Sequence, residues 1–242
     1  MEKIKSFHSA LLMRHFSSTR LLLLISTEIT EGDCSKWAST LKEQGHSFDS
    51  SPQVLYHLDG VISAPSLTVG RLRHELIKSG IINMTASLEF FLSNIVSFRI
   101  RRNPSYFKKA LEQHGPAIGL YDHVDFTDID QMSKKYIDGL AQIICQGKLW
   151  SKKLKNVCEF LNVNSPNPIH KTIDSIWEMR NSIAHKKLST LMFTSDGKTF
   201  VHSESSTKDE HLEFVITLLT VFEKLLALLI DMDRDTMPMV TH

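Results

Sequence analysis

The chain has 242 residues, with 28 Lys and Arg against 27 Asp and Glu, so its net charge is +1. A composition of 42% hydrophobic and 23% charged residues is that of an ordinary soluble globular protein. A chain of this length buries roughly 70% of its unfolded surface and needs no disulfides to stay folded. The charge balance excludes histone-like binding and an acidic disordered tail, so any polyanion must meet a local patch.

The three cysteines are odd in number and lack CxxC spacing, which argues against a disulfide framework and a cysteine zinc site. We therefore expect buried free thiols in a reducing cytoplasm. The N-terminal apolar run at residues 21–25 is too short and too closely preceded by charges for a signal peptide. The apolar stretch 212–230 contains Glu213, Glu223 and Lys224, which predicts a core helix rather than a membrane span. We expect no membrane partner and a cytoplasmic protein.

Helical periodicity extends over nearly the whole chain, because few Gly and Pro interrupt it. One buried stripe is expected on the longest helix, which Asn103-Pro104 ends. The residues of this stripe are Ile81, Met84, Leu88, Phe91, Leu92, Ile95 and Phe98. The predicted helices cover residues 2–26, 33–44, 68–102, 104–113, 128–146 (or 130–146), 148–162, 171–187 and 208–231.

A small β-hairpin is predicted over residues 191–194 and 199–202, joined across Ser195-Asp196-Gly197. The fold class is therefore an all-α helical bundle with one small β-hairpin inserted before its last helix.

The predicted helix 171–187 contains a segment with an unusual pattern, in which a charged residue lies within the apolar face. On a helical wheel, Arg180 projects into the middle of an apolar arc that contains Ile176 and Trp177. A charge there is costly unless it has a partner or lies at an interface. Asn181 and His185, four residues apart, share the adjoining face. A fixed cation, an amide and an imidazole are the groups that hold a phosphate and move protons near neutral pH.

The segment Arg-Asn-Ser-Ile-Ala-His at residues 180–185 resembles the Arg-x4–6-His signature of HEPN domains (higher eukaryotes and prokaryotes nucleotide-binding). Residues 85–92 resemble the early helix of the RiboL-PSP-like branch, which often carries an acidic residue, here Glu89. The resemblance covers residues 65–235. It divides the chain into an N-terminal helical extension of unknown role (1–64), a HEPN-like helical domain (65–235) and a tail (236–242).

The resemblance implies a homodimer with both motifs at its interface and a metal-independent endoribonuclease without a cofactor. His185 is expected to act as general base or acid while the ribose 2′-OH attacks the adjacent phosphorus. Arg180 is expected to stabilise the charge on the phosphoryl oxygens, Asn181 to orient the histidine or the phosphate, and Glu89 to serve as a supporting acid. The products would be 2′,3′-cyclic phosphate and 5′-hydroxyl ends. Such proteins commonly act as toxins or antiviral defence effectors, with an antitoxin or another partner protein.

Other interpretations stay open. The Arg180–His185 pair also suits a solvated surface, or cations that the helix dipole favours near a C-terminus. A HEPN-like bundle without catalysis would be an RNA- or protein-binding module. Glu89 lies off the buried stripe of its helix, which favours an ordinary solvated side chain.

Lys186 and Lys187 follow the motif directly and are candidates for RNA binding. They would form a patch if the fold brings them near the other basic clusters. Those clusters are Arg99, Arg101, Arg102, Lys108, Lys109, Lys148, Lys152, Lys153 and Lys155.

The remaining acidic residues and histidines are not expected to form a catalytic or metal site. The acidic loop 122–130 resembles no standard metal site and reads as a solvated loop that ends in a helix cap, so we predict no bound metal. The other histidines keep no ligand spacing, and we expect loop or surface positions for His74, His202 and His211.

Overall fold

The computed structural model describes residues 7–47, 62–115, 134–164, 170–185 and 189–235. Within these ranges the chain is mostly helical with one antiparallel two-stranded hairpin, which confirms the predicted all-α class at that level. The elements in chain order are α1 (Phe7–Glu28), α2 (Glu31–Ser47), α4 (Pro65–Arg102), α5 (Pro104–His114), α6 (Lys134–Ile144), α7 (Trp150–Leu161), α8 (His170–His185), β1 (Thr190–Ser195), β2 (Lys198–Ser203) and α9 (Lys208–Asp235).

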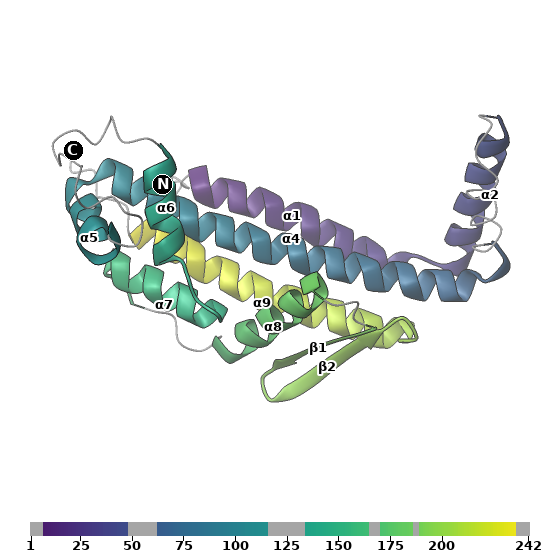
Figure 1. The fold of residues 1–242 in the computed structure, drawn as a ribbon. Coiled ribbons are helices and arrows are strands. Elements are labelled where there is room, and N and C mark those ends of the chain that lie inside the picture. The colour runs from purple at the N-terminus through teal and green to yellow at the C-terminus, as the bar shows by residue number, and fades with distance from the viewer. Residues whose placement is uncertain (1–6, 48–61, 116–133, 165–169, 186–188, 236–242) are drawn as a thin grey trace, which may run out of the picture.

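Three long helices form the body of the molecule (Figure 1). Helix α1 runs antiparallel to α4, and α9 packs against both of them, while α5, α6 and α7 gather where α4 ends. Helix α8 and the hairpin lie along one side of the body. The predicted stripe on α4 is buried except for the partly exposed Phe98. Of the described helices, α4 alone is long and apolar enough to cross a membrane, and half of its most apolar window is buried inside the fold.

The two N-terminal helices pack differently. Leu12 and Leu23 of α1 share one hydrophobic core with α4 and α9. A Cβ at Gly80 would lie 2.7 Å from Leu23 Cδ2, so this glycine permits the close approach of α1 to α4. Helix α2 stands away from the body and contacts it through a separate small cluster that contains Cys34 and Val69. The first helix of the predicted extension therefore belongs to the main core, and a functional division at residue 64 stays a prediction.

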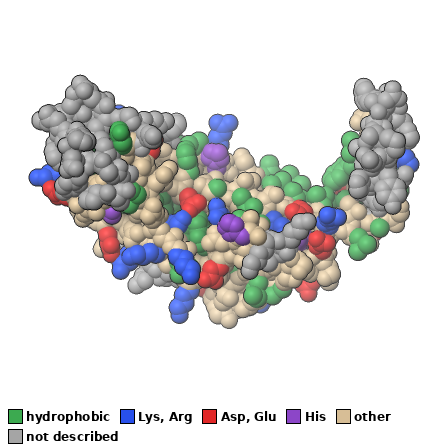
Figure 2. Space-filling model, viewed as in Figure 1, with side chains coloured by type: hydrophobic (Ala, Val, Ile, Leu, Met, Phe, Trp, Pro, Cys, Tyr) green, Lys and Arg blue, Asp and Glu red, His purple; other side chains and the backbone are tan. Residues whose placement is uncertain are grey.

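The molecular surface reflects the near-zero net charge. On the face drawn in Figure 2, basic and acidic side chains are intermixed, and hydrophobic side chains gather between the body and α2. The exposed large apolar residues of the described part of the chain include Leu21, Leu24 and Ile25 of α1, and Trp37 and Leu41 of α2.

The hairpin confirms the sequence prediction. Its strands pair from Thr190 opposite Ser203 to Ser195 opposite Lys198, one residue longer at each end than predicted. The turn consists of Asp196 and Gly197, with φ of 51° and 79°. Positive φ at both central residues is the type I′ geometry that Asp-Gly favours, and its twist suits the flanking strands.

Candidate functional site

Helix α8 places the predicted motif at its C-terminal end. The predicted apolar arc is buried at Ile173, Ile176, Trp177 and Met179, half-buried at Ile183 and exposed at Ala184, so it is confirmed except at the end of the helix. Asn181 is half-buried, and His185 is the last residue of the helix and exposed. The motif therefore occupies the final turn and a half, with its cation toward the core and its imidazole in solvent.

Arg180 lies against a carboxylate of another helix. Its Nη2 atom is 3.9 Å from Oε2 of Glu89 on α4, and Glu89 also pairs with Nζ of Lys153 on α7. The side chains of Arg180 and Glu89 are 26% and 33% exposed. A half-buried cation thus has the charged partner that its position in the apolar arc requires. Glu89 is partly exposed, but it is more than an ordinary solvated residue, because its carboxylate lies beside two cations as their shared counter-ion.

Both cations also lie over one aromatic ring. Lys153 Nζ is 4.5 Å, and Arg180 Cζ 5.3 Å, from the centroid of Trp177. A cation over an indole face is attracted by the ring quadrupole. Glu89, Lys153, Trp177 and Arg180, which we call the Arg180 cluster, therefore form one unit with two positive charges and one negative.

Most N–H donors of the Arg180 guanidinium have no hydrogen-bond partner among the described residues. Its Nη1 donates to Asn181 Oδ1 at 3.0 Å, and this is its one hydrogen bond among the described residues. Its Nε is buried and, within the same part of the chain, has no hydrogen-bond partner. Arginine carries five N–H donors, and a buried unpaired donor is costly and uncommon in folded proteins. Because Nε is buried, an additional acceptor from outside the fold can bind only to the Nη groups of this partly exposed cation.

His185 is not joined to this cluster. In the ranges that the structure describes, no hydrogen bond or ion pair connects it to Arg180 or Glu89. Residues five apart on a helix differ by about 140° in direction, which separates the imidazole from the guanidinium. Lys186 and Lys187 lie outside the described residues, as does the acidic loop 122–130. Among the described residues, no group of three or more His, Cys, Asp or Glu is arranged to hold a metal ion.

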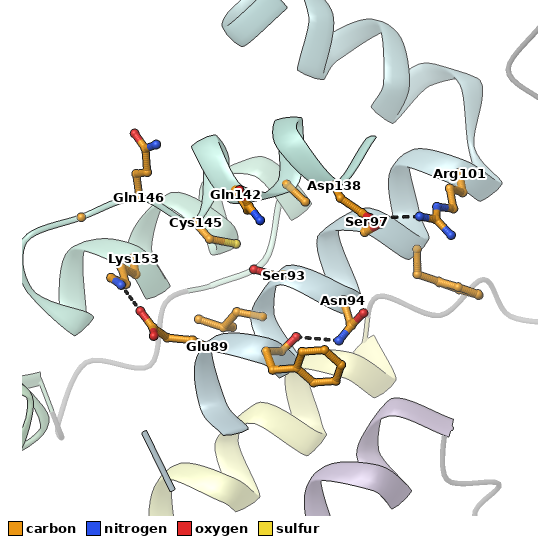
Figure 3. A pocket seen from close by; sticks show the side chains of 15 residues that line it. Glu89, Ser93, Asn94, Ser97, Arg101, Asp138, Gln142, Cys145, Gln146 and Lys153 are labelled. Atoms are coloured by element: carbon orange, nitrogen blue, oxygen red, sulfur yellow. Dashed lines mark hydrogen bonds and ion pairs between the residues drawn. The ribbon is translucent and has the colours of Figure 1, made fainter. Parts of the chain in front are cut away.

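An open cleft adjoins the Arg180 cluster. It has a volume of about 810 Å³ and lies between α4 and the segment from α6 to the start of α7 (Figure 3). Glu89 and Lys153 line one end, and Arg101 and Asp138 line another part of its wall. Cys145 also lines it, but burial raises the pKa of its thiol to about 12. This cysteine is therefore protonated near neutral pH and unsuited to act as a nucleophile.

Several basic residues of the predicted patch have structural roles instead. Arg99 is buried, and burial lowers the pKa of its guanidinium. Lys109 Nζ donates to the carbonyl of Phe160 at 2.8 Å and so caps the end of α7. Arg101 pairs with Asp138 at 2.9 Å. Two members of the predicted RNA-tracking patch are therefore not available to RNA: Arg99 is buried, and the ammonium group of Lys109 is bound to the end of α7.

Three histidines form a buried hydrogen-bonded chain that contradicts their expected surface positions. His74 Nδ1 of α4 lies 3.1 Å from His202 Nδ1 of β2, and His202 Nε2 lies 2.9 Å from His211 Nδ1 of α9. His211 Nε2 in turn lies 3.0 Å from Oγ of Ser26 in α1. All four residues are at most 1% exposed. This histidine chain ties four elements together beneath the hairpin.

The hydrogen bonds fix the protonation of the histidine chain. Ser26 Oγ donates its single proton to the Leu23 carbonyl at 2.6 Å, so it accepts from His211 Nε2–H. His211 Nδ1 must then accept from His202 Nε2–H, and His202 Nδ1 must accept from His74 Nδ1–H. Burial lowers the pKa of His202 to about 3 and that of His211 to about 4, with the charge of Arg73 acting in the same direction. Both rings are therefore neutral at pH 7.

Comparison with known proteins found no relative of this chain. No protein-family model matches the chain, and no curated protein or solved structure matches it significantly.

Proposed function

We propose that the protein is a metal-independent endoribonuclease of the HEPN kind. The observation that carries the proposal is the state of Arg180, which is held by Glu89 and Trp177, makes a single hydrogen bond among the described residues, and keeps donors for a phosphate. The exposed His185 at the end of the same helix supplies an imidazole that is accessible to RNA. The resemblance of residues 180–185 to the HEPN signature supports the same reading.

The proposed reaction is an internal transfer at one phosphorus atom. The ribose 2′-oxygen attacks, its proton passes to a base, and the P–O2′ bond forms as the P–O5′ bond breaks. The departing 5′-oxygen takes a proton, which leaves a 2′,3′-cyclic phosphate and a 5′-hydroxyl. Because the two side chains of one chain point about 140° apart, the proposal joins them across the interface of the proposed homodimer: His185 of one chain serves as base or acid, and Arg180 of the other binds the phosphoryl oxygens. Asn181 fixes the guanidinium of its own chain through its amide oxygen. Glu89 acts by positioning Arg180.

The test is incubation of the purified protein with total RNA and a tRNA pool in excess EDTA. We expect cleavage by the wild type, none by His185→Ala, and normal cleavage by His15→Ala, which removes another exposed histidine. Fragments should accept a 5′-label from a kinase without prior phosphatase treatment, because their 5′ ends are hydroxyls. Equal cleavage by the wild type and His185→Ala would remove the assignment.

The alternative is a non-catalytic HEPN-like helical module that binds RNA or protein. The pairing of Arg180 with Glu89 favours it, because this guanidinium already has a counter-ion. This alternative predicts RNA or protein binding that His185→Ala leaves intact, together with no cleavage by any variant.

The cellular role is proposed on the resemblance of the motif alone. It comprises a cytoplasmic homodimer with its motifs at the interface and a toxin or antiviral effector held in check by an antitoxin or another partner. Induced expression of the wild type should arrest bacterial growth, while expression of His185→Ala at the same level should not. Arrest by both proteins would separate toxicity from the proposed chemistry.

A further inference from the structure

Charged and uncharged polar side chains lie in a regular order along the wall of the cleft beside the Arg180 cluster. One side is α4, which contributes Glu89, Ser93, Asn94, Ser97 and Arg101 at spacings of about one helical turn. Figure 3 shows Gln142 and Asp138 of α6 across from them. Charged residues occupy the two ends of the α4 row, and uncharged polar residues lie between.

The charges of this wall cancel. Lys153 pairs with Glu89, and Arg101 Nη2 lies 2.9 Å from Asp138 Oδ1, which also accepts from Ser97 Oγ at 2.9 Å. Two cations thus face two carboxylates, each within hydrogen-bonding contact. An anionic group gains no net attraction here, so the cleft favours a neutral polar ligand.

The middle of the cleft offers uncharged donors and acceptors beside an aromatic ring. Gln142 is exposed and, among the described residues, makes no hydrogen bond, so its amide presents both a donor and an acceptor. Asn94 Nδ2 donates to the Phe90 carbonyl at 2.8 Å, which leaves Oδ1 as an acceptor. Phe90, which is 56% exposed, lies at the edge of the cleft between α4 and α6 and also lines a small hollow against α1. An aromatic face beside amide groups is the chemistry that recognises an unpaired nucleobase.

We propose that this cleft binds one unpaired nucleobase, and that the base belongs to a nucleotide next to the phosphate held at Arg180. This rests on the proposed ribonuclease function. The continuity is direct, since Glu89 both lines the cleft and contacts Arg180. A volume of about 810 Å³ lies within the range of pockets that hold small molecules and suffices for a nucleoside. Bases inside an A-form duplex are stacked and paired, so the cleft selects single strands.

The test measures binding apart from cleavage. The probe is a fluorescein-labelled, mixed-sequence single-stranded 12-mer with 2′-O-methyl riboses, which blocks attack by the 2′-oxygen. We expect the Kd to rise about tenfold for Gln142→Ala and by tenfold or more for Phe90→Ala. Gln113→Ala, which removes an exposed glutamine of α5, should bind as the wild type does. Unchanged thermal midpoints would show that the variants fold.

Two further arms identify the source of the base. Competition by micromolar AMP, GMP, CMP or UMP that Gln142→Ala abolishes would support the base site and assign it to free nucleotides. Binding of the 12-mer without such competition would support the base site as part of an RNA groove. Equal affinity of the wild type and both cleft variants, equal binding of a duplex, or no binding by the wild type would overturn the proposal.

The two proposals fail in different ways. If the wild type cuts no RNA but its binding of the 12-mer depends on Gln142, the nuclease assignment is lost and the base site stands. If the wild type cuts RNA and Gln142→Ala binds and cuts normally, the reverse holds.

Discussion

The histidine chain and the Arg180 cluster are two places where polar side chains from distant segments meet against the core. In the histidine chain each linking nitrogen has a partner at 2.9–3.1 Å, and all members are buried. In the Arg180 cluster the three charged side chains are partly exposed, the Arg180–Glu89 pair spans 3.9 Å, and one buried donor lacks a partner among the described residues. A closed and satisfied network serves stability, whereas an open and incompletely satisfied one can bind and act on a ligand.

The largest expected effect is on cleavage. His185→Ala should lower the rate of RNA cleavage about 10²- to 10⁴-fold, the range for loss of a general acid or base. The side chain is exposed, so the thermal midpoint should stay within about 1 °C of the wild type. Cleavage rates in EDTA and thermal unfolding curves measure the two effects. If His185→Ala lowers the thermal midpoint but still cleaves RNA, His185 is a structural residue, and the proposed difference in role between His185 and the histidine chain is wrong.

The next effect is on stability. His202→Ala removes the middle of the histidine chain and leaves His74 and His211 each without one buried partner. We expect a loss of about 2–4 kcal/mol in the free energy of unfolding, from unsatisfied polar groups and a cavity. Urea titration measures it, with Thr199→Ala on the exposed face of the same strand as control. A loss no larger than that of the control would show that the histidine chain is not a stabilising network.

The pH dependence of stability follows from the lowered pKa values of His202 and His211. Both rings are neutral in the fold, but in the unfolded chain they bind protons below about pH 6.5. Their contribution is complete above that pH and is lost as the pH falls toward about 4, by about 1.4 kcal/mol per pH unit for each ring. Urea midpoints at pH 7, 6 and 5 should fall in that order. His211→Gln should flatten the dependence, and a wild type equally stable at pH 7 and 5 would contradict the neutral assignment.

A smaller effect is expected at Glu89. Glu89→Gln removes the counter-ion of Arg180 and Lys153, which should cost about 1 kcal/mol of stability for a half-exposed pair. Cleavage should fall about tenfold because the guanidinium loses its fixed position. Glu159→Gln, which frees the exposed Lys155, is the matched control and should change neither quantity measurably. Cleavage at the full rate by Glu89→Gln would remove the positioning role.

Local patterns predicted most of the fold. The 3.6-residue periodicity and the few breakers locate the helices, and Asp196-Gly197 locates the hairpin turn because both residues tolerate positive φ. The position of Arg180 in an apolar arc predicted that it would need a partner or an interface. In the structure Glu89, 91 residues earlier in the chain, is that partner.

Tertiary arrangement accounts for what the sequence could not predict. His74, His202 and His211 come from two helices and a strand, so no local spacing marks their meeting. The inward position of His202 on an alternating strand was the one available signal. The sequence also could not predict that α2 stands away from the body. Apolar residues such as Trp37 and Leu41 usually indicate a buried helix face, but here both are exposed.

The most direct test of the account compares His185→Ala with His202→Ala in one assay, as RNA cleavage in EDTA per folded molecule. The account predicts that His185→Ala is fully folded and inactive. It predicts that His202→Ala has a lower thermal midpoint but, below that midpoint, cleaves at nearly the wild-type rate per folded molecule. Wild-type cleavage by His185→Ala would contradict the assignment of Arg180 and His185 as the working site.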